Sequence, residues 1–174
     1  QQVVMGQMRL PELPAAFVAS LKLPPEQAAF LNVLSAAGKA GTAPDFDSWD
    51  GFPAARARLL GAAQAADADL VVLSGDSHNG WAFDLASQGK PAGVEFGGHS
   101  VSSPGIEAYL ALPPQLTAQF IMRASPELKW ADTSSRGYMA VQLTPERVTG
   151  EWVFMDTVKA RSLAIRPGKT MSVE

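Results

Sequence analysis

The residues whose types and spacing best suit chemistry follow a short apolar segment near the middle of the chain. Residues 69–74 read Asp-Leu-Val-Val-Leu-Ser, and Gly75, Asp76, Ser77 and His78 come directly after them. A carboxylate and an imidazole two residues apart suit Fe, Mn or Zn, and the carboxylate alone suits Ca²⁺. Open α/β sheets bind ligands at the carboxyl ends of their strands. We therefore interpret Asp76 and His78 as candidate metal ligands, although two donors alone would hold a metal weakly.

Two other interpretations of the same residues involve no metal. In the first, Asp76 caps a turn and His78 makes an ordinary hydrogen bond nearby. In the second, Ser77 is the nucleophile of a GDSL-type serine esterase and a later histidine is its base. That family usually pairs an early serine with a late Asp-x-x-His, whereas the later histidine of this chain, His99, follows Phe-Gly-Gly. The resemblance to the esterases therefore rests on the Gly-Asp-Ser block alone.

Two further loops place polar residues beside predicted helix starts. Residues 47–53 read Asp-Ser-Trp-Asp-Gly-Phe-Pro, and a carboxylate such as Asp50 is favoured by the positive end of the helix that follows. Residues 97–105 read Gly-Gly-His-Ser-Val-Ser-Ser-Pro-Gly, and their glycines permit close approach of the backbone to a ligand. Each loop also has a structural interpretation: a capping loop with Trp49 as a core anchor, and an ordinary turn between a strand and a helix.

The elements that must position these loops follow from apolar spacing and from glycine and proline. Helical spacing behind a proline or serine predicts helices at residues 25–37, 53–66, 103–110 and 114–123. Apolar runs and alternation predict strands at residues 3–8, 69–74, 81–85, 94–96, 138–143 and 147–155. We expect the strand at residues 69–74 to be buried on both faces, and the last two strands to form a hairpin.

Less regular segments separate these elements. Residues 10–25 contain four prolines and can hold only short helical turns. In the helix at residues 53–66, Ala55, Leu59 and Ala62 should face the core while Arg56 and Arg58 point elsewhere. Residues 165–174 are polar and contain glycine and proline, so order should fade there.

The composition is that of a globular chain of single-domain size. Of its 174 residues, 47% are hydrophobic and 18% charged, and a net charge of −3 without a basic stripe argues against a nucleic-acid partner. The lack of cysteine excludes disulfides and thiolate metal ligands within these residues. No run approaches the ~18 apolar residues that cross a bilayer, and the first 25 residues lack a signal-peptide pattern.

The order of the motifs resembles the C-terminal half of PhoD-like alkaline phosphatases/phosphodiesterases. The matching segments are residues 4–6, 47–56, 71–78, 94–96, 102–105, 136–138 and 148–158. The resemblance implies an α/β fold, namely the C-terminal half of a metallophosphoesterase-type α/β/β/α sandwich with a mixed sheet. It also implies a phosphatase segment at residues 1–158 and a C-terminal tail at residues 159–174.

The resemblance assigns metal ligands as well. Metallophosphoesterases close their metal site with Gly-His-x-His, and residues 75–78 are similar, with aspartate in place of the first histidine. Asp76 and His78 are thereby implied as ligands. The added carboxylate makes the site richer in oxygen, which suits the Ca²⁺ and Fe³⁺ associated with PhoD-like enzymes.

Other residues receive roles from the same resemblance. Trp49, Asp50 and Asn79 are implied in the phosphate pocket or its surroundings. His99 departs from the small polar residue that the resemblance leads us to expect near this point, and it is either an accessory acid near the leaving group or a surface histidine. The substrate would be a phosphate mono- or diester, hydrolysed by a metal-bound hydroxide.

We expect the chain to be a fragment of a longer enzyme. It begins Gln-Gln-Val-Val-Met-Gly without an initiator Met, and the other ligands of the family match nothing in it. It should therefore need the missing N-terminal half and be inactive alone, and its exposed sheet edges would favour a dimer. The resemblance suggests export, often by a twin-arginine route, to the periplasm or the medium. The alternative class is a non-enzymatic binding or scaffold domain whose Asp-x-His turn is structural.

Overall fold

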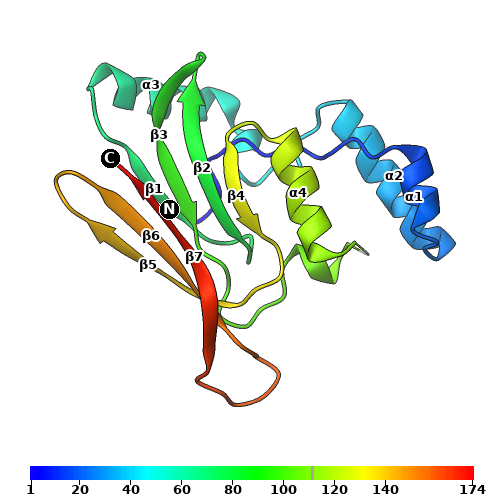
Figure 1. The fold of residues 1–174 in the computed structure, drawn as a ribbon. Coiled ribbons are helices and arrows are strands. Elements are labelled where there is room, and N and C mark those ends of the chain that lie inside the picture. Colours follow the sequence, from blue (N-terminus) through cyan, green and yellow to red (C-terminus); the bar gives the residue numbers. More distant parts are fainter. Residues whose placement is uncertain (111) are drawn as a thin grey trace.

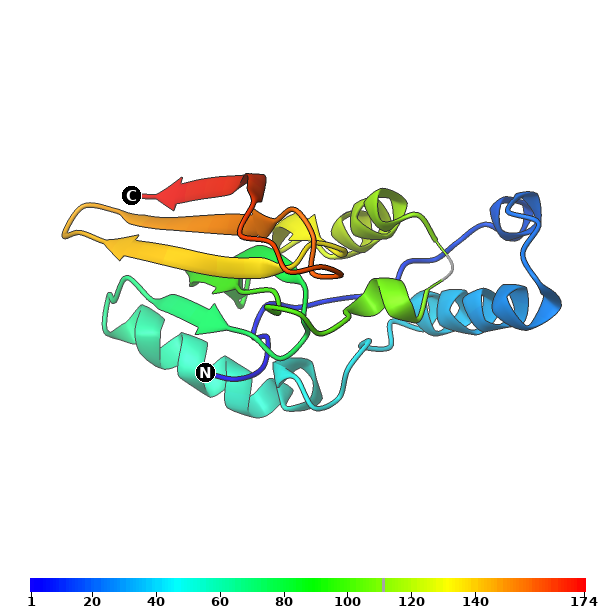
Figure 2. The same ribbon diagram turned by 90° about the horizontal axis from the view of Figure 1, so that it is seen from below.

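Two β-sheets face each other, and helices cover the outer face of one of them. The computed structural model describes residues 1–110 and 112–174. Figure 2 shows helix α3 (Pro53–Ala65), a four-stranded sheet beside it and a three-stranded sheet beyond that. This α/β architecture with a mixed sheet confirms the predicted fold class.

The four-stranded sheet contains the strand that leads into the loop at residues 75–78. In spatial order its strands are β1 (Val71–Ser74), β3 (Lys90–Gly97), β2 (Gly80–Ser87) and β4 (Leu128–Asp132). Because β1 and β3 are parallel, the loops that follow them emerge at the same edge. β1 is an outer strand whose Leu73 is 39% exposed, so the prediction of burial on both of its faces is wrong. The strand β4 was not predicted.

The three-stranded sheet consists of β5 (Gly137–Leu143), β6 (Val148–Met155) and β7 (Ile165–Val173). The predicted hairpin of β5 and β6 is confirmed. The expectation that order fades after residue 165 is wrong, because β7 pairs with β6 along its length. Met171 and Val173 of β7 pack against the core, while the rest of this outer strand is largely exposed. Its polar composition therefore reflects an edge strand and not a disordered tail.

The helices begin where proline permits. α2 (Pro25–Lys39), α3 and α4 (Pro114–Ala124) each have proline in the first turn, whose fixed φ suits that position. The short α1 (Ala15–Ser20) pairs with α2, and the two extend to one side of the sheets (Figure 1). Of the helix predicted at residues 103–110, only the 3-10 turn η2 (Ile106–Ala108) forms. None of the helices in residues 1–110 and 112–174 combines the length and apolarity needed to cross a membrane.

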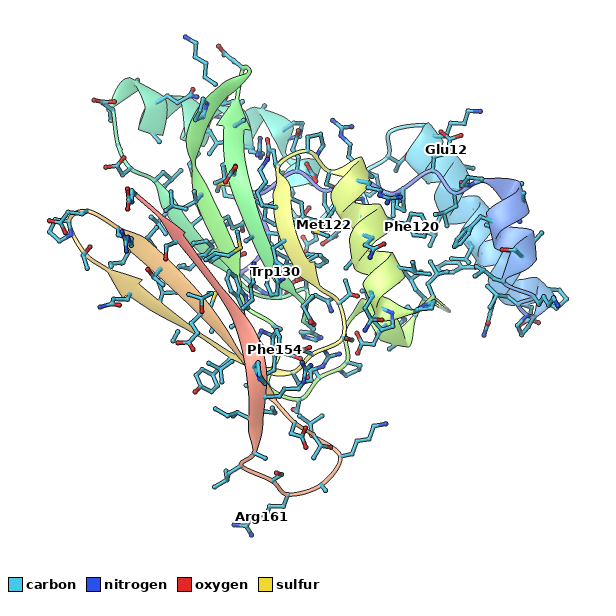
Figure 3. All side chains as sticks on the ribbon, in the orientation of Figure 1. Glu12, Phe120, Met122, Trp130, Phe154 and Arg161 are labelled. Atoms are coloured by element: carbon cyan, nitrogen blue, oxygen red, sulfur yellow. The ribbon has the colours of Figure 1, made fainter. Side chains whose placement is uncertain are left out.

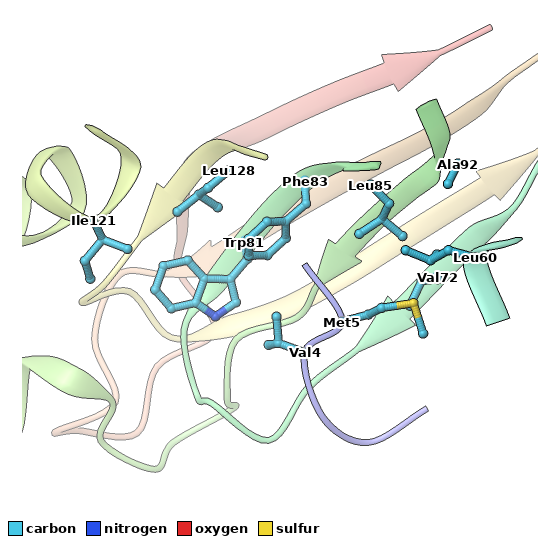
Figure 4. Close-up of a cluster of buried hydrophobic side chains, with 10 residues drawn as sticks. All are labelled: Val4, Met5, Leu60, Val72, Trp81, Phe83, Leu85, Ala92, Ile121 and Leu128. Carbon is cyan, nitrogen blue, oxygen red and sulfur yellow. The ribbon is translucent and has the colours of Figure 1, made fainter. Parts of the chain in front are cut away.

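Alternation along β2 divides the core around the four-stranded sheet into two parts. One part lies on the helix side of the four-stranded sheet and is shown in Figure 4, where Trp81, Phe83 and Leu85 of β2 meet Leu60 of α3. The other part lies between the two sheets, where Phe96 of β3 packs with Trp152, Phe154 and Trp130. Figure 3 labels Trp130 and Phe154, which come from different sheets.

The first residues follow an extended path that belongs to neither sheet, so the strand predicted at residues 3–8 is wrong. We call residues 4–9 the N-terminal segment. Side-chain oxygens, not a neighbouring strand, accept five successive backbone N–H groups: those of Met5 and Gly6 bind Glu95, Gln7 binds Glu127, Met8 binds Asp50 and Arg9 binds Ser125. A side chain on Gly6 would collide with the ring of Phe83, which explains the glycine at this position.

Glu95, completely buried on β3, is the main anchor of the N-terminal segment. Its carboxylate oxygens lie 2.9 and 3.1 Å from the Met5 nitrogen, and one lies 2.6 Å from the Gly6 nitrogen. Burial raises the pKa of Glu95 above its ordinary value. The Ser74 hydroxyl, the two N–H groups and the Arg56 guanidinium lower this pKa without compensating for burial.

Arg56 of α3 holds the N-terminal segment from the helix side. Its Nε donates to the Met5 carbonyl oxygen at 2.7 Å, and its guanidinium pairs with the Glu127 carboxylate at 2.7 Å. Arg56 and Leu60 are buried while Leu59 is partly exposed. The predicted core face of α3 is therefore wrong, because a paired arginine occupies a position that pattern reasoning reserves for apolar residues.

His99, which follows β3, packs between the two sheets. Its ring lies edge-on to Phe154, with centroids 5.1 Å apart. Burial lowers the pKa of His99, Asp132 and the Val153 carbonyl raise it, and Arg136 and Arg166 lower it further. The Val153 carbonyl lies close to the ring, but neither ring nitrogen makes a hydrogen bond of acceptable geometry with the described residues. The interpretation of His99 as a surface histidine is therefore wrong.

We predict that Glu95→Ala strongly destabilises the fold. The substitution leaves two buried N–H groups without an acceptor, and each such group costs about 1–3 kcal/mol. Urea unfolding at pH 7 should show a loss of at least about 2 kcal/mol. The control Glu151→Ala, at an exposed position of β6, should change the free energy of unfolding by less than about 0.5 kcal/mol. Similar losses in the two variants would show that Glu95 is not an anchor.

We also predict a pH dependence of stability that originates from His99. A lowered pKa in the folded state means that the unfolded chain takes up the proton first, so stability is lost as the pH falls through the ordinary histidine pKa of about 6.5. In His99→Gln, thermal unfolding between pH 8 and pH 5.5 should vary less with pH than in the wild type. A His99→Gln profile that varies with pH as steeply as that of the wild type would contradict the assignment.

Candidate functional site

The loop after β1 turns sharply through two left-handed residues. Asp76 has φ 62° and His78 has φ 61°, and both side chains are exposed. Positive φ is uncommon for residues other than glycine, although aspartate and histidine tolerate it better than most. Such conformations cluster at functional sites, because the surrounding structure must hold them in place. The turn thus presents the two predicted metal ligands at the carboxyl edge of the parallel pair β1 and β3.

The hydrogen bonds of this loop help to distinguish the metal-site interpretation from the serine-esterase interpretation. The Nδ1 atom of His78 lies 2.8 Å from the Pro104 carbonyl oxygen, and an oxygen of Asp76 accepts from the Gln2 side chain at 3.2 Å. The Ser77 hydroxyl accepts from the Trp81 indole at 2.6 Å. No histidine nitrogen in the described part of the chain bonds to the Ser77 hydroxyl. The arrangement therefore lacks the serine and histidine pair that an esterase needs.

Asn79 directly follows the loop but points into the protein. Its side chain is 1% exposed, and its Oδ1 accepts from the Ile106 backbone N–H at 3.1 Å. The family resemblance implies a place for Asn79 in the phosphate pocket. In the structure its side chain joins the loop after β1 to the loop after β3.

The predicted pocket residues Trp49 and Asp50 make hydrogen bonds to different segments of the chain. The Trp49 indole donates to the Gln1 side chain at 2.6 Å, and the Gln1 amino group donates to the Leu73 carbonyl at 3.0 Å, so Trp49 lies near the end of β1. Asp50 accepts from the Met8 N–H at 2.9 Å. Burial raises the pKa of Asp50, and the Met8 bond lowers it. Trp49 and Asp50 both line a cavity of about 320 Å³, together with Gln7, Pro53, Arg56, Ala57, Ala86, Ser87, Gln88, Gly89 and Glu127.

Sequence reasoning did not identify Arg136 and Glu107 as site residues. The buried guanidinium of Arg136 forms an ion pair with the Glu107 carboxylate and lies 3.5 Å from the His78 carbonyl oxygen. The sequence signal was present in the Arg-Gly-Tyr motif at residues 136–138, where a charged residue directly precedes a strand. Glu107 gave no such signal, because an acidic residue within a predicted helix is ordinary.

Buried polar atoms without partners gather around this edge. Among the described residues they include Nδ2 of Asn79, both ring nitrogens of His99 and Oε2 of Glu107. Most buried polar groups in native proteins are hydrogen-bonded, so each exception requires an explanation. These three residues follow β1 or β3. Buried polar atoms that lack a partner depart from the usual pattern of a stable fold, and such departures are expected at functional sites.

The donor atoms fit part of a metal centre but not a whole one. A carboxylate and an imidazole are suitable ligands for Ca²⁺ and Fe³⁺ respectively. Within residues 1–110 and 112–174, no group of three or more His, Cys, Asp or Glu side chains is close enough to hold a metal ion. A metal bound at Asp76 and His78 would therefore need further ligands besides the His, Cys, Asp and Glu side chains of the described residues.

Comparisons with known proteins agree with the family resemblance seen in the sequence. Alkaline phosphatase D of Bacillus subtilis (strain 168) is 30% identical over 125 residues, which span 68% of this chain and 21% of that protein. A solved structure titled "Structure of PhoD" matches 99% of this chain and 28% of its own, with a TM-score of 0.65 and 20% identity, which supports the fold. The chain thus spans between a fifth and a third of the length of these relatives. The pattern of the family described as PhoD-like phosphatase matches residues 1–152, and the chain belongs to that family.

Proposed function

We propose that the intact protein carrying this chain hydrolyses phosphate mono- or diesters with the help of bound metal ions. The observation that supports this most directly is the left-handed turn that presents Asp76 and His78 at the carboxyl edge of β1. Family membership supports the reaction class. The hydrogen bonds of Ser77 and His78 leave little support for a serine esterase.

The residues of this chain would contribute binding and orientation. Asp76 would offer a carboxylate oxygen and His78 its outer ring nitrogen, because Nδ1 is engaged by Pro104. Bound Ca²⁺ and Fe³⁺, the metals we propose, would neutralise phosphate charge and supply a hydroxide nucleophile. Trp49, beside the end of β1, would form part of the wall of the site. His99, buried and with a lowered pKa, is poorly suited to donate a proton at alkaline pH.

This chain would supply only part of the enzyme. β1 is an outer strand, and residues 1 and 2 bond to the backbone only at its end, so the rest of its edge is open to further strands. We propose that the remaining ligands come from the rest of a longer protein, that residues 1–174 alone are inactive, and that isolated chains pair through this edge. Export to the periplasm or the medium belongs to the same proposal and rests on the family alone.

We predict that His78→Ala and Asp76→Asn each lower kcat/KM of the full-length protein at least about 100-fold. Loss of outer-shell partners of a metal already costs 10–100-fold, and loss of a ligand should cost more. Turnover of p-nitrophenyl phosphate and bis-p-nitrophenyl phosphate would be measured together with metal content. Asp67→Asn is the matched control, since Asp67 is also exposed and left-handed at φ 49°, and its activity should remain unchanged.

Other variants distinguish the competing functions. Ser77→Ala should retain most of the activity, and chelation should abolish it, whereas a serine esterase would show the opposite pattern. A scaffold domain would show neither metal nor turnover in the wild type. Folded His78→Ala protein with wild-type turnover would remove His78 from the site.

A further inference from the structure

One hydrogen bond determines which nitrogen of His78 is free. Its Nδ1 lies 2.8 Å from the Pro104 carbonyl oxygen. A carbonyl oxygen only accepts hydrogen bonds, so Nδ1 must carry the hydrogen, and in the neutral ring Nε2 then keeps its lone pair. Histidines that bind metals almost always donate their other ring N–H to such a partner.

The loop that supplies Pro104 is attached to the His78 loop at a second point. We call residues 102–107 the brace loop. Asn79 accepts from the Ile106 N–H at 3.1 Å while buried to 1% exposure. A side chain on Gly105 would collide with the Asn79 amide, so glycine allows the two loops to approach this closely. The pair His78 and Asn79 therefore contacts the brace loop on both sides of Gly105.

Arg136 and Glu107 connect the brace loop to the His78 loop at a further point. One oxygen of Glu107 accepts from the Gly105 N–H at 3.1 Å and also pairs with the Arg136 guanidinium. The same guanidinium donates to the Ser135 carbonyl oxygen and lies 3.5 Å from that of His78. A buried ion pair is costly to desolvate and adds little net stability on its own. Here the pair joins the residue before β5, the brace loop and the His78 loop.

We propose that Asn79, Glu107 and Arg136 are positioning residues, which hold the Pro104 carbonyl against His78 so that the ring presents Nε2 at the carboxyl edge of β1. The use of that Nε2 as a metal ligand rests on the proposed function. The assignment of the His78 tautomer does not rest on the proposed function. Asn79 thereby acts on His78 through the brace loop and does not itself contact a phosphate group.

Long-range ¹H–¹⁵N NMR of the chain with labelled histidine tests the proposal directly. The chain has two histidines, and His99→Gln identifies the signals of His78. We expect His78 of the wild type in the Nδ1–H form. Arg136→Gln should convert it to a mixture of tautomers, whereas the matched control Arg147→Gln, which removes the exposed Arg147–Glu174 pair, should leave it unchanged. An Nε2–H form in the wild type, or an unchanged tautomer in folded Arg136→Gln, would overturn the proposal.

A second variant covers the case in which Arg136→Gln does not fold. Glu107→Gln keeps the shape of the side chain but removes the charge that pairs with Arg136, so it should shift the His78 tautomer in the same direction. Folding is judged by the indole N–H signals of Trp130 and Trp152, which belong to the packing between the sheets. Folded Glu107→Gln with the wild-type tautomer would count against the brace.

Zn²⁺ titration of the full-length protein separates this proposal from the proposed function. Arg136→Gln should weaken Zn²⁺ binding about tenfold, as loss of outer-shell partners usually does. If His78→Ala leaves the Zn²⁺ affinity unchanged while the wild-type ring is Nδ1–H, the metal role fails and the positioning role stands. If the ring is Nε2–H, the positioning role fails whatever the metal data show.

Discussion

The buried carboxylate of Glu95 is the contact on which the rest of this structure depends. It lies on the helix side of β3, and it accepts the N–H groups of Met5 and Gly6. A charged group in this position would be unfavourable without those partners. The bond fixes the N-terminal segment across the sheet, and the residues just before that segment reach the end of β1. There the Gln2 carbonyl accepts from the Gly75 N–H at 2.9 Å, and the Gln2 side chain contacts Asp76.

The two faces of the four-stranded sheet have different tasks. Alternation along β3 directs Phe96 toward the second sheet and Glu95 toward the helices, so one strand serves both an apolar and a polar layer. The loops that follow β1 and β3 then meet at one edge, where His78 contacts Pro104 and Asn79 contacts Ile106. The geometry of the edge thus follows from the parallel pairing of two short strands.

The sequence predicted those parts of the molecule that local rules determine. Proline positions located α2, α3 and α4, and alternation around Trp152 located the hairpin of β5 and β6. It failed where long-range contacts decide. The path of residues 3–8 depends on side chains far along the chain, and the buried face of α3 depends on the partners of Arg56. The link between Arg136 and Glu107 joins segments 29 residues apart, which spacing could not show.

The N-terminal segment also has a consequence for the order of folding. Its acceptors Asp50, Glu95, Ser125 and Glu127 lie between 42 and 120 residues further along the chain. Contacts of such large sequence separation require long loops to close before they become favourable, which slows folding. As the chain leaves the ribosome, Arg9 emerges 116 residues before its acceptor Ser125, and residues 4–9 cannot take their final path until residues 125–127 are available. The part of this chain that is made first is therefore among the last to settle.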